Sequence, residues 1–217
     1  MRFSADAILF DSDETLVSSQ RSVLRVWRQW AESYGMTLEE AMSRVEVHGR
    51  PAAAIIADLL PEEQVKDGVQ RLVDAEVADA AAGGVEAVGG AVKLLTSLPQ
   101  DRWAVVTSSS RRVVEARLAP VGIRPKFLVT SDDVTHHKPH PEPFLVAAEW
   151  LGVDPAHCVV VEDSPTGLAS ARAAGMATIA LTTTHKAHQL EADATVADLT
   201  GVSVQITETG ALEITVG

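Results

Sequence analysis

The chain has 217 residues, 46% of them hydrophobic, and a formal net charge of −12 at pH 7. Its length suits one medium-sized domain, or a core with a small insertion, and is sufficient to bury a sizeable apolar core. The negative charge argues against partners that are themselves strongly negative. We therefore expect no binding to nucleic acid and no binding to an anionic membrane surface.

The first residues and the lack of a long apolar stretch predict a cytoplasmic protein. Residues 1–4 lack a signal-peptide pattern, and no apolar stretch approaches the roughly 18 residues that span a bilayer. Cys158 is the only cysteine, so it cannot form an intrachain disulfide. It lies in an apolar run, where a small buried core residue is expected.

The first predicted strand, residues 5–10, ends directly in two carboxylates. Asp11 and Asp13 follow the apolar run 7–10 and are separated by one residue. Ligands of open α/β sheets bind at the carboxyl ends of the strands, so both side chains should face a cleft. Two neighbouring carboxylates suit a hard cation, a nucleophile with an acid/base partner, or both. A solvated strand end with turn-forming residues is the alternative.

Residues 18–86 are predicted to be almost entirely helical. An apolar face begins at Val23 and continues until Gly35 ends the first helix. Thr37 begins a capping box, and Pro51 and Pro61 each suit the first position of a further helix. Because this stretch contains no strand candidate, it predicts a helical insertion directly after the first strand.

From residue 90 onward, helices and strands alternate along the chain. The expected strands are 102–107, 127–130, 158–162 and 177–182, and the expected helices are 90–98, 111–120, 141–151 and 165–174. This alternation predicts a parallel sheet covered by helices on both faces. Residues 202–216 alternate apolar and polar side chains around a turn at 208–210, which predicts a C-terminal β-hairpin.

The ends of the later elements carry side chains suited to phosphoryl transfer. Thr107 ends one expected strand and Ser108 follows it, Glu162 and Asp163 stand at the end of another, and Lys138 lies in the segment 136–139, before the expected helix 141–151. Carboxylates bind Mg²⁺, an ammonium group neutralises phosphate charge, and hydroxyls at a helix start donate to phosphate oxygens. Each residue also has a structural explanation, such as helix capping or a surface lysine. Their combination in this order is much more specific than any one of them.

On these residues the chain resembles the haloacid dehalogenase-like superfamily of phosphohydrolases over nearly its whole length. The motifs of that family match Asp11 to Thr15, Thr107, Lys138 with Pro139, and Glu162 with Asp163. The resemblance implies a Rossmann-like core with a helical cap inserted after the first motif. We therefore expect residues 1–17 and 87–217 to form the core and residues 18–86 to form the cap.

The resemblance also implies a mechanism. Asp11 would attack the phosphorus to form an aspartyl-phosphate, and Asp13 would protonate the leaving oxygen and then activate water. Lys138 and Thr107 would hold the phosphoryl group, with Ser108 as a further phosphate donor. The expected ligands of Mg²⁺ are Asp11, the backbone carbonyl of Asp13, Glu162 and Asp163.

Within the capped branch, the chain is similar to glycerol-phosphate and 2-deoxyglucose-6-phosphate phosphatases. Segments 103–108 and 138–143 carry much of this similarity. The expected substrate is a small sugar or polyol phosphate monoester. The neighbouring β-phosphoglucomutases usually have a histidine where this chain has Val23 and an arginine where it has Ala52, which weakens the phosphomutase alternative.

The cap segment His48-Gly49-Arg50 is the candidate for substrate contact, because a closing cap excludes water and contacts the leaving group. A surface role for Arg50, in front of a helix, is the alternative. Since a cap of this type already covers the site, we expect a monomer or a weak dimer.

Glu14 stands where the family usually has glycine, which eases an unusual backbone conformation at this point. It adds a third carboxylate near the site and could retune or slow the enzyme. A weakly active or regulatory phospho-acceptor module is therefore an alternative from another class. Phospho-receiver domains, however, usually place the phosphorylated aspartate on a middle strand without a helical insertion.

Overall fold

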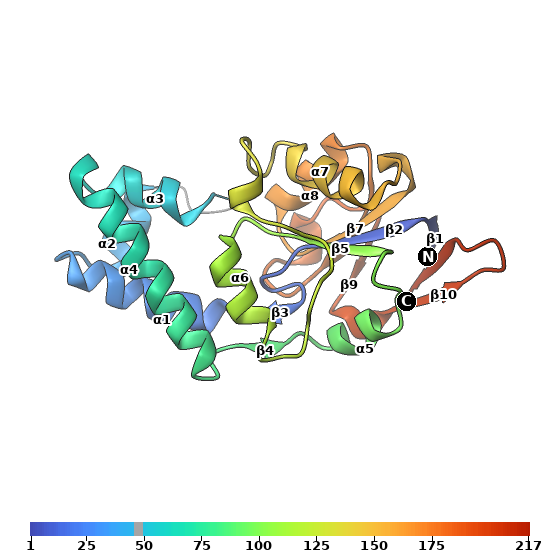
Figure 1. Cartoon of the computed structure of the whole chain (residues 1–217), viewed down its shortest axis with the longest axis horizontal. Coiled ribbons are helices and arrows are strands. Elements are labelled where there is room, and N and C mark those ends of the chain that lie inside the picture. The colour runs from blue at the N-terminus through green and yellow to red at the C-terminus, as the bar shows by residue number, and fades with distance from the viewer. Residues whose placement is uncertain (46–49) are drawn as a thin grey trace.

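A computed structural model of the chain describes residues 1–45 and 50–217. Its centre is a six-stranded sheet in the order β6-β5-β2-β7-β8-β9 (Figure 1). In chain order these strands are β2 (Ala7–Phe10), β5 (Trp103–Val106), β6 (Leu128–Val129), β7 (Cys158–Glu162), β8 (Ala177–Leu181) and β9 (Ala194–Val196). All neighbouring pairs are parallel, so the predicted α/β class is confirmed and the carboxyl ends of the strands meet at one edge.

Helices cover both faces of this sheet, as predicted. They are α5 (Ala91–Thr96), α6 (Arg111–Leu118), α7 (Glu142–Leu151) and α8 (Pro165–Ala173). Ala7 and Leu9 of β2 belong to the apolar cluster that includes α7 and α8, whereas Ile8 and Phe10 belong to the one that includes α5 and α6. Because successive side chains of a strand point to opposite faces, a strand that is covered twice must be apolar throughout.

The predicted first strand, 5–10, is two strands in the structure because the chain changes sheets at Asp6. Strand β1 (Arg2–Ala5) pairs antiparallel with β11 (Leu212–Val216), which also pairs with β10 (Val202–Ile206). The predicted C-terminal hairpin is confirmed, and β1 extends it to a three-stranded sheet. Strand β9 was not predicted, since three residues are too few to show a periodic pattern.

Four helices form a separate group beside the sheet (Figure 1). They are α1 (Gln20–Ser33), α2 (Leu38–Arg44), α3 (Ala52–Leu59) and α4 (Glu62–Ala81). The group has its own apolar core, which includes Trp27, Trp30, Ile56 and Leu72. Trp30 also donates from Nε1 to the carbonyl of Gly68 at 2.8 Å, which joins α1 to α4. No helix in the described part of the chain is long and apolar enough to cross a membrane.

Two short strands connect the helical group to the rest of the chain. Strand β3 (Val17–Ser18) pairs antiparallel with β4 (Glu86–Ala87), so the chain leaves for the helices and returns from them at neighbouring points. A pair of two-residue strands gives no periodic signal, which is why the sequence showed no strand there. The domain boundaries predicted after residues 17 and 86 fall within these strands, and the division into core and cap remains a prediction.

Candidate active site

Asp11 and Lys138 lie together at the carboxyl edge of the parallel sheet. The Nζ of Lys138 is 2.6 Å from Oδ1 of Asp11 and 3.0 Å from Oε1 of Glu162. It also donates to the carbonyl of Val106 at 3.0 Å. Burial by itself favours the neutral amine, but the carboxylates of Asp11 and Glu162 hold the pKa of Lys138 above its ordinary value. The lysine is therefore a fixed positive charge beside Asp11.

Glu162 and Asp163 complete a buried carboxylate cluster with Asp11. One oxygen of each residue lies within 4.8 Å of the others. Burial, reinforced by the charge of Glu162, raises the pKa of Asp163 to about 7. Burial also raises the pKa of Asp11, although Lys138 opposes the shift. Three carboxylates around a single ammonium leave an excess of negative charge away from water, and a hard divalent cation such as Mg²⁺ fits such a set of oxygen donors.

Thr107 and Ser108 occupy the predicted position at the end of β5. The side chain of Thr107 is buried, and its backbone N–H donates to the carbonyl of Val129 at 2.9 Å. Its Oγ1 accepts the backbone N–H of Ser109 at 3.1 Å, which shapes the turn before α6. The structure thus brings both hydroxyl residues to the edge that carries Asp11, while their contact with phosphate remains a prediction.

The side chain of Asp13 is held by donors from three different segments. Ser19 donates from Oγ to Oδ1 at 2.6 Å, and Ser109 donates from Oγ to Oδ2 at 3.0 Å. Arg117 of α6 donates from Nη1 to Oδ1 at 2.8 Å. These contacts fix the orientation of the carboxylate. Asp13 is not a member of the three-carboxylate cluster, which is compatible with the expectation that it would contribute only its backbone carbonyl to a metal.

Sequence reasoning missed Arg117, which joins the site to the helical group. Its guanidinium is buried and forms a second ion pair, at 2.9 Å, with Oε1 of the buried Glu76 on α4. The signal in the sequence is its position four residues after Val113 and one before Leu118, on the buried side of α6. A charge at such a position needs a buried partner.

The backbone of Glu14 is in the left-handed region, with φ of 61°. This is the unusual conformation expected from the glycine that the family usually has at this position. Its carboxylate has a local partner, because Oε1 accepts the backbone N–H groups of Ser19 and Gln20, both at 2.6 Å. Ser19 is the N-cap residue of α1 but makes no side-chain cap, since its hydroxyl is bonded to Asp13. Glu14 therefore caps the helix in place of Ser19 and, as an acid, also suits the positive end of the helix dipole.

This double role predicts effects of different size for two substitutions of Glu14. Glu14→Ala loses the cap and keeps the left-handed backbone, so we expect a loss of about 1–2 kcal/mol in the free energy of unfolding. Glu14→Gly loses the same cap but removes the backbone strain, so its stability should exceed that of Glu14→Ala by about 1 kcal/mol. Urea unfolding measures both. Equal stability of the two variants would show that the backbone at this position is not strained.

A cavity of about 430 Å³ lies beside Asp13, between the helical group and the carboxyl edge of the sheet. Its helical wall is mainly apolar and includes Leu24, Trp27 and Ile55, whereas Ser108 and Arg117 lie on the opposite wall. A molecule in this cavity would have one end near Asp13 and the rest against the helices. The cavity therefore has the position expected for the leaving group of a substrate.

The predicted cap contacts are only partly described. Arg50 lines the cavity, and its guanidinium also pairs with Asp58 at 2.8 Å. This placement is compatible both with substrate contact and with a structural role in front of α3. His48 and Gly49 lie outside the described residues.

Comparison with known proteins gives one family. The family model described as haloacid dehalogenase-like hydrolase matches residues 8–181. The chain is 37% identical over 177 residues to hexitol phosphatase A of Escherichia coli (strain K12), covering 80% of this chain and 81% of the relative. It is 35% identical over 195 residues to glycerol-1-phosphate phosphohydrolase 2 of Saccharomyces cerevisiae, covering 85% of this chain and 77% of the relative.

A solved structure shows the same architecture. The crystal structure of CbbY from Rhodobacter sphaeroides in complex with phosphate superposes with a TM-score of 0.78 and 25% sequence identity. The match covers 90% of this chain and 95% of that one. The aligned 90% of the chain must include part of the helical group, because the sheet and the helices that cover it make up a smaller share of the residues. The similarity therefore extends over both parts of the chain.

Proposed function

Because this chain belongs to the haloacid dehalogenase-like hydrolase family, we propose that it is a Mg²⁺-dependent phosphatase that hydrolyses a small sugar or polyol phosphate monoester. The observation that carries the proposal is the buried contact of Lys138 with Asp11, inside a carboxylate cluster and beside the cavity that Asp13 lines. The relatives are named for the hydrolysis of hexitol and glycerol phosphates, which supports the substrate class.

In the proposed reaction, a carboxylate oxygen of Asp11 forms a bond to phosphorus as the bond to the leaving alcohol breaks. Asp13 gives a proton to the departing oxygen, so that the alcohol leaves neutral. Asp13 then takes a proton from water, whose oxygen attacks the phosphorus and breaks its bond to Asp11. Free phosphate is released and both carboxyl groups return to their first state. Lys138 neutralises negative charge on the phosphoryl oxygens, and Lys138 and Thr107 together hold them in position throughout.

The metal would be held by Asp11, Asp163 and the backbone carbonyl of Asp13, with Glu162 assisting. When bound, Mg²⁺ supplies positive charge to the phosphoryl group and to the carboxylates around it. The buried cluster supports this assignment because Lys138 offsets only part of its negative charge. Glu162 would act mainly by orientation, since its Oε2 already accepts the backbone N–H groups of Asp163 and Ser164 at 2.8 and 2.7 Å.

The helical group would act as a cap that covers the leaving group and excludes water. Val23 and Ala52 both line the cavity, at positions where the resembling phosphomutases usually carry a histidine and an arginine. The cavity thus lacks those two polar side chains, which favours hydrolysis over intramolecular phosphoryl transfer. The proposed setting is the cytoplasm, with the protein acting as a monomer or a weak dimer.

The test is phosphate release by the purified protein from a panel of hexitol, glycerol and deoxyglucose phosphates, with glucose 1-phosphate included. We expect multiple turnovers with Mg²⁺, loss of activity with a chelator, and recovery when Mg²⁺ is restored. Isomerisation of glucose 1-phosphate without release of phosphate would indicate the mutase instead. A single stable phosphorylation per chain would indicate a regulatory phospho-acceptor, and no reaction with any ester would contradict the proposal.

A further inference from the structure

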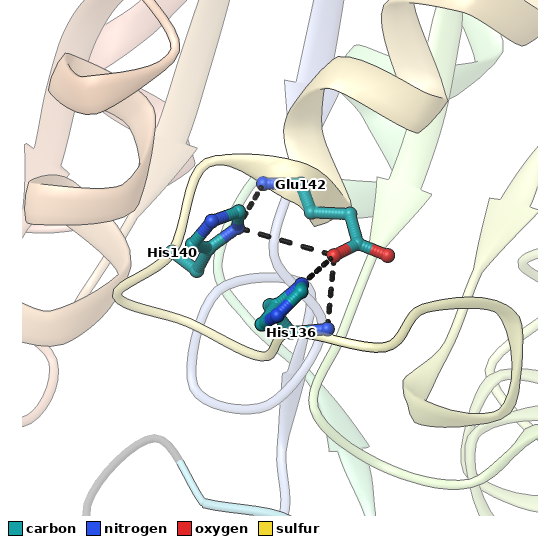
Figure 2. Close-up of side chains that lie close together, drawn as sticks. All are labelled: His136, His140 and Glu142. Carbon is teal, nitrogen blue, oxygen red and sulfur yellow. Dashed lines mark hydrogen bonds and ion pairs between the residues drawn. The ribbon is translucent and has the colours of Figure 1, made fainter.

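We propose that His136, His140 and Glu142 form a second metal site, which binds a divalent cation of the zinc type and is distinct from the carboxylate cluster. The two histidines lie in the loop that leads into α7, and Glu142 is the first residue of that helix. Figure 2 shows both imidazole rings turned toward one carboxylate oxygen of Glu142. This inference is independent of the proposed function.

The three ligand atoms already lie close to one another. Nδ1 of His136 is 2.6 Å from Oε2 of Glu142, and Nδ1 of His140 is 4.0 Å from the same oxygen. All three ligand atoms lie within 4.8 Å of one another. Zinc holds nitrogen and oxygen ligands at about 2.0–2.2 Å, which places tetrahedral ligand atoms roughly 3.3–3.6 Å apart. Small movements of the two rings would therefore accommodate an ion.

The backbone already holds this arrangement without a metal. Glu142 accepts the N–H of Thr135 at 2.7 Å and the N–H of His136 at 2.9 Å, so its carboxylate has a fixed position. Nδ1 of His140 accepts the N–H of Glu142 at 3.2 Å, which fixes the ring beside the carboxylate; an ion bound through Nδ1 would replace this hydrogen bond. The centroids of the two imidazole rings lie 4.5 Å apart, and the ring planes are inclined by 31°. Orientation of ligands by such surrounding hydrogen bonds is typical of metal sites.

The ligand types separate this group from the carboxylate cluster. Two imidazoles and a carboxylate suit zinc, whereas three carboxylates suit magnesium. The side chains of His136 and His140 are 62% and 50% exposed, so water could complete the coordination and an ion could enter from solvent. Among the described residues, this group and the carboxylate cluster are the two sets of three potential ligands that lie close enough to share an ion.

A bound ion would also join the two ends of the loop that carries Lys138. His136 precedes this lysine by two residues, and His140 follows it by two. An ion that binds only the folded chain stabilises the fold by an amount that grows with the logarithm of its concentration above Kd. Zinc should therefore raise the melting temperature of the protein.

The test is calorimetric titration of zinc into the full chain in the presence of excess Mg²⁺, which occupies the carboxylate cluster. We expect one zinc ion per chain. His136→Ala and His140→Ala should each weaken binding by at least about tenfold, since loss of a ligand should cost no less than loss of an orienting group. Asp163→Asn should retain zinc binding.

The control variant is His157→Ala. The side chain of His157 is 65% exposed, and its Nδ1 lies 3.2 Å from Oδ2 of Asp6, so it forms a similar histidine–carboxylate pair outside the proposed site. This variant should bind zinc like the parent. The absorption spectrum of Co²⁺ added in place of zinc should show ligand-field bands that both site variants lose. The proposal would be overturned if the parent protein showed no saturable zinc binding. It would also be overturned if His157→Ala lost as much zinc affinity as the two site variants.

Discussion

Asp11→Asn is expected to reduce turnover by at least about 10⁴-fold, since loss of a catalytic nucleophile typically has effects of this size or larger. Asparagine preserves the shape of the side chain but is a far weaker nucleophile than a carboxylate. The variant should nevertheless fold, because burial raises the pKa of Asp11 and the native site therefore disfavours its negative charge. Steady-state phosphate release, together with the melting temperature of each protein, measures the two effects separately.

A comparison with Asp13→Asn distinguishes the two proposed roles. The proton from Asp13 matters most for a poor leaving group such as a sugar alkoxide, and least for a good one such as nitrophenolate. Asp13→Asn should therefore retain a single burst of nitrophenol release from nitrophenyl phosphate, whereas Asp11→Asn should show none. A burst of equal size in both variants would exclude Asp11 as the nucleophile.

Sequence patterns predicted those parts of the fold that have long, repeated signals. The buried strands β5, β7 and β8 are largely apolar, and the helices between them have clear starts, so their order indicated a parallel sheet. The sequence pattern of one strand does not show, however, which other strand it pairs with. The exchange of sheets at Asp6, which separates β1 from β2, depends on pairing with residues some two hundred positions later, and nothing local marks it.

The site was predictable where a motif places a side chain at the end of a strand. Asp11 and Asp163 follow β2 and β7, and neighbouring parallel strands bring them together. Contacts that depend on how one helix packs against another could not be derived in this way. Arg117 contacts Glu76 only because α6 packs against α4. The cap of α1 by Glu14 is local, but it replaces a cap by Ser19, whose hydroxyl is bonded to Asp13, and no motif marks that exchange.

Arg117→Met is expected to lower the free energy of unfolding by about 3–5 kcal/mol, the usual effect of removing one partner from a buried ion pair. The guanidinium of Arg117 is buried and contacts Glu76 at 2.9 Å and Asp13 at 2.8 Å, so its loss leaves two carboxylates without their cation. Methionine fills a similar volume, which limits any contribution from an empty cavity. Urea unfolding of the metal-free protein measures the difference.

A matched control lies on the same pair of helices. Arg112 of α6 pairs with Asp74 of α4 at 2.5 Å, but both side chains are about half exposed. Arg112→Met should therefore cost less than about 1 kcal/mol. If the two arginine variants lose equal stability, the burial of the Arg117 ion pair does not account for the loss in Arg117→Met.

The effect of pH tests whether the charge left on Glu76 accounts for the loss. Burial raises the pKa of Glu76 even with Arg117 present, and removing the guanidinium should raise it further. An acid whose pKa is raised by folding binds a proton more readily in the folded chain, so the stability deficit should shrink as the pH falls from 8 toward 5. The double variant Arg117→Met/Glu76→Leu should recover much of the loss at pH 8.

Activity gives a separate measure of the contact with Asp13. Arg117 is a positioning residue, since it fixes the orientation of Asp13 and touches no predicted phosphoryl ligand. Its loss should lower kcat more than it changes KM, and more for a sugar phosphate than for nitrophenyl phosphate, because only the former leaving group depends strongly on a proton from Asp13. The double variant should regain stability without regaining kcat. If kcat recovers together with stability, the role of Arg117 is confined to holding the helices together.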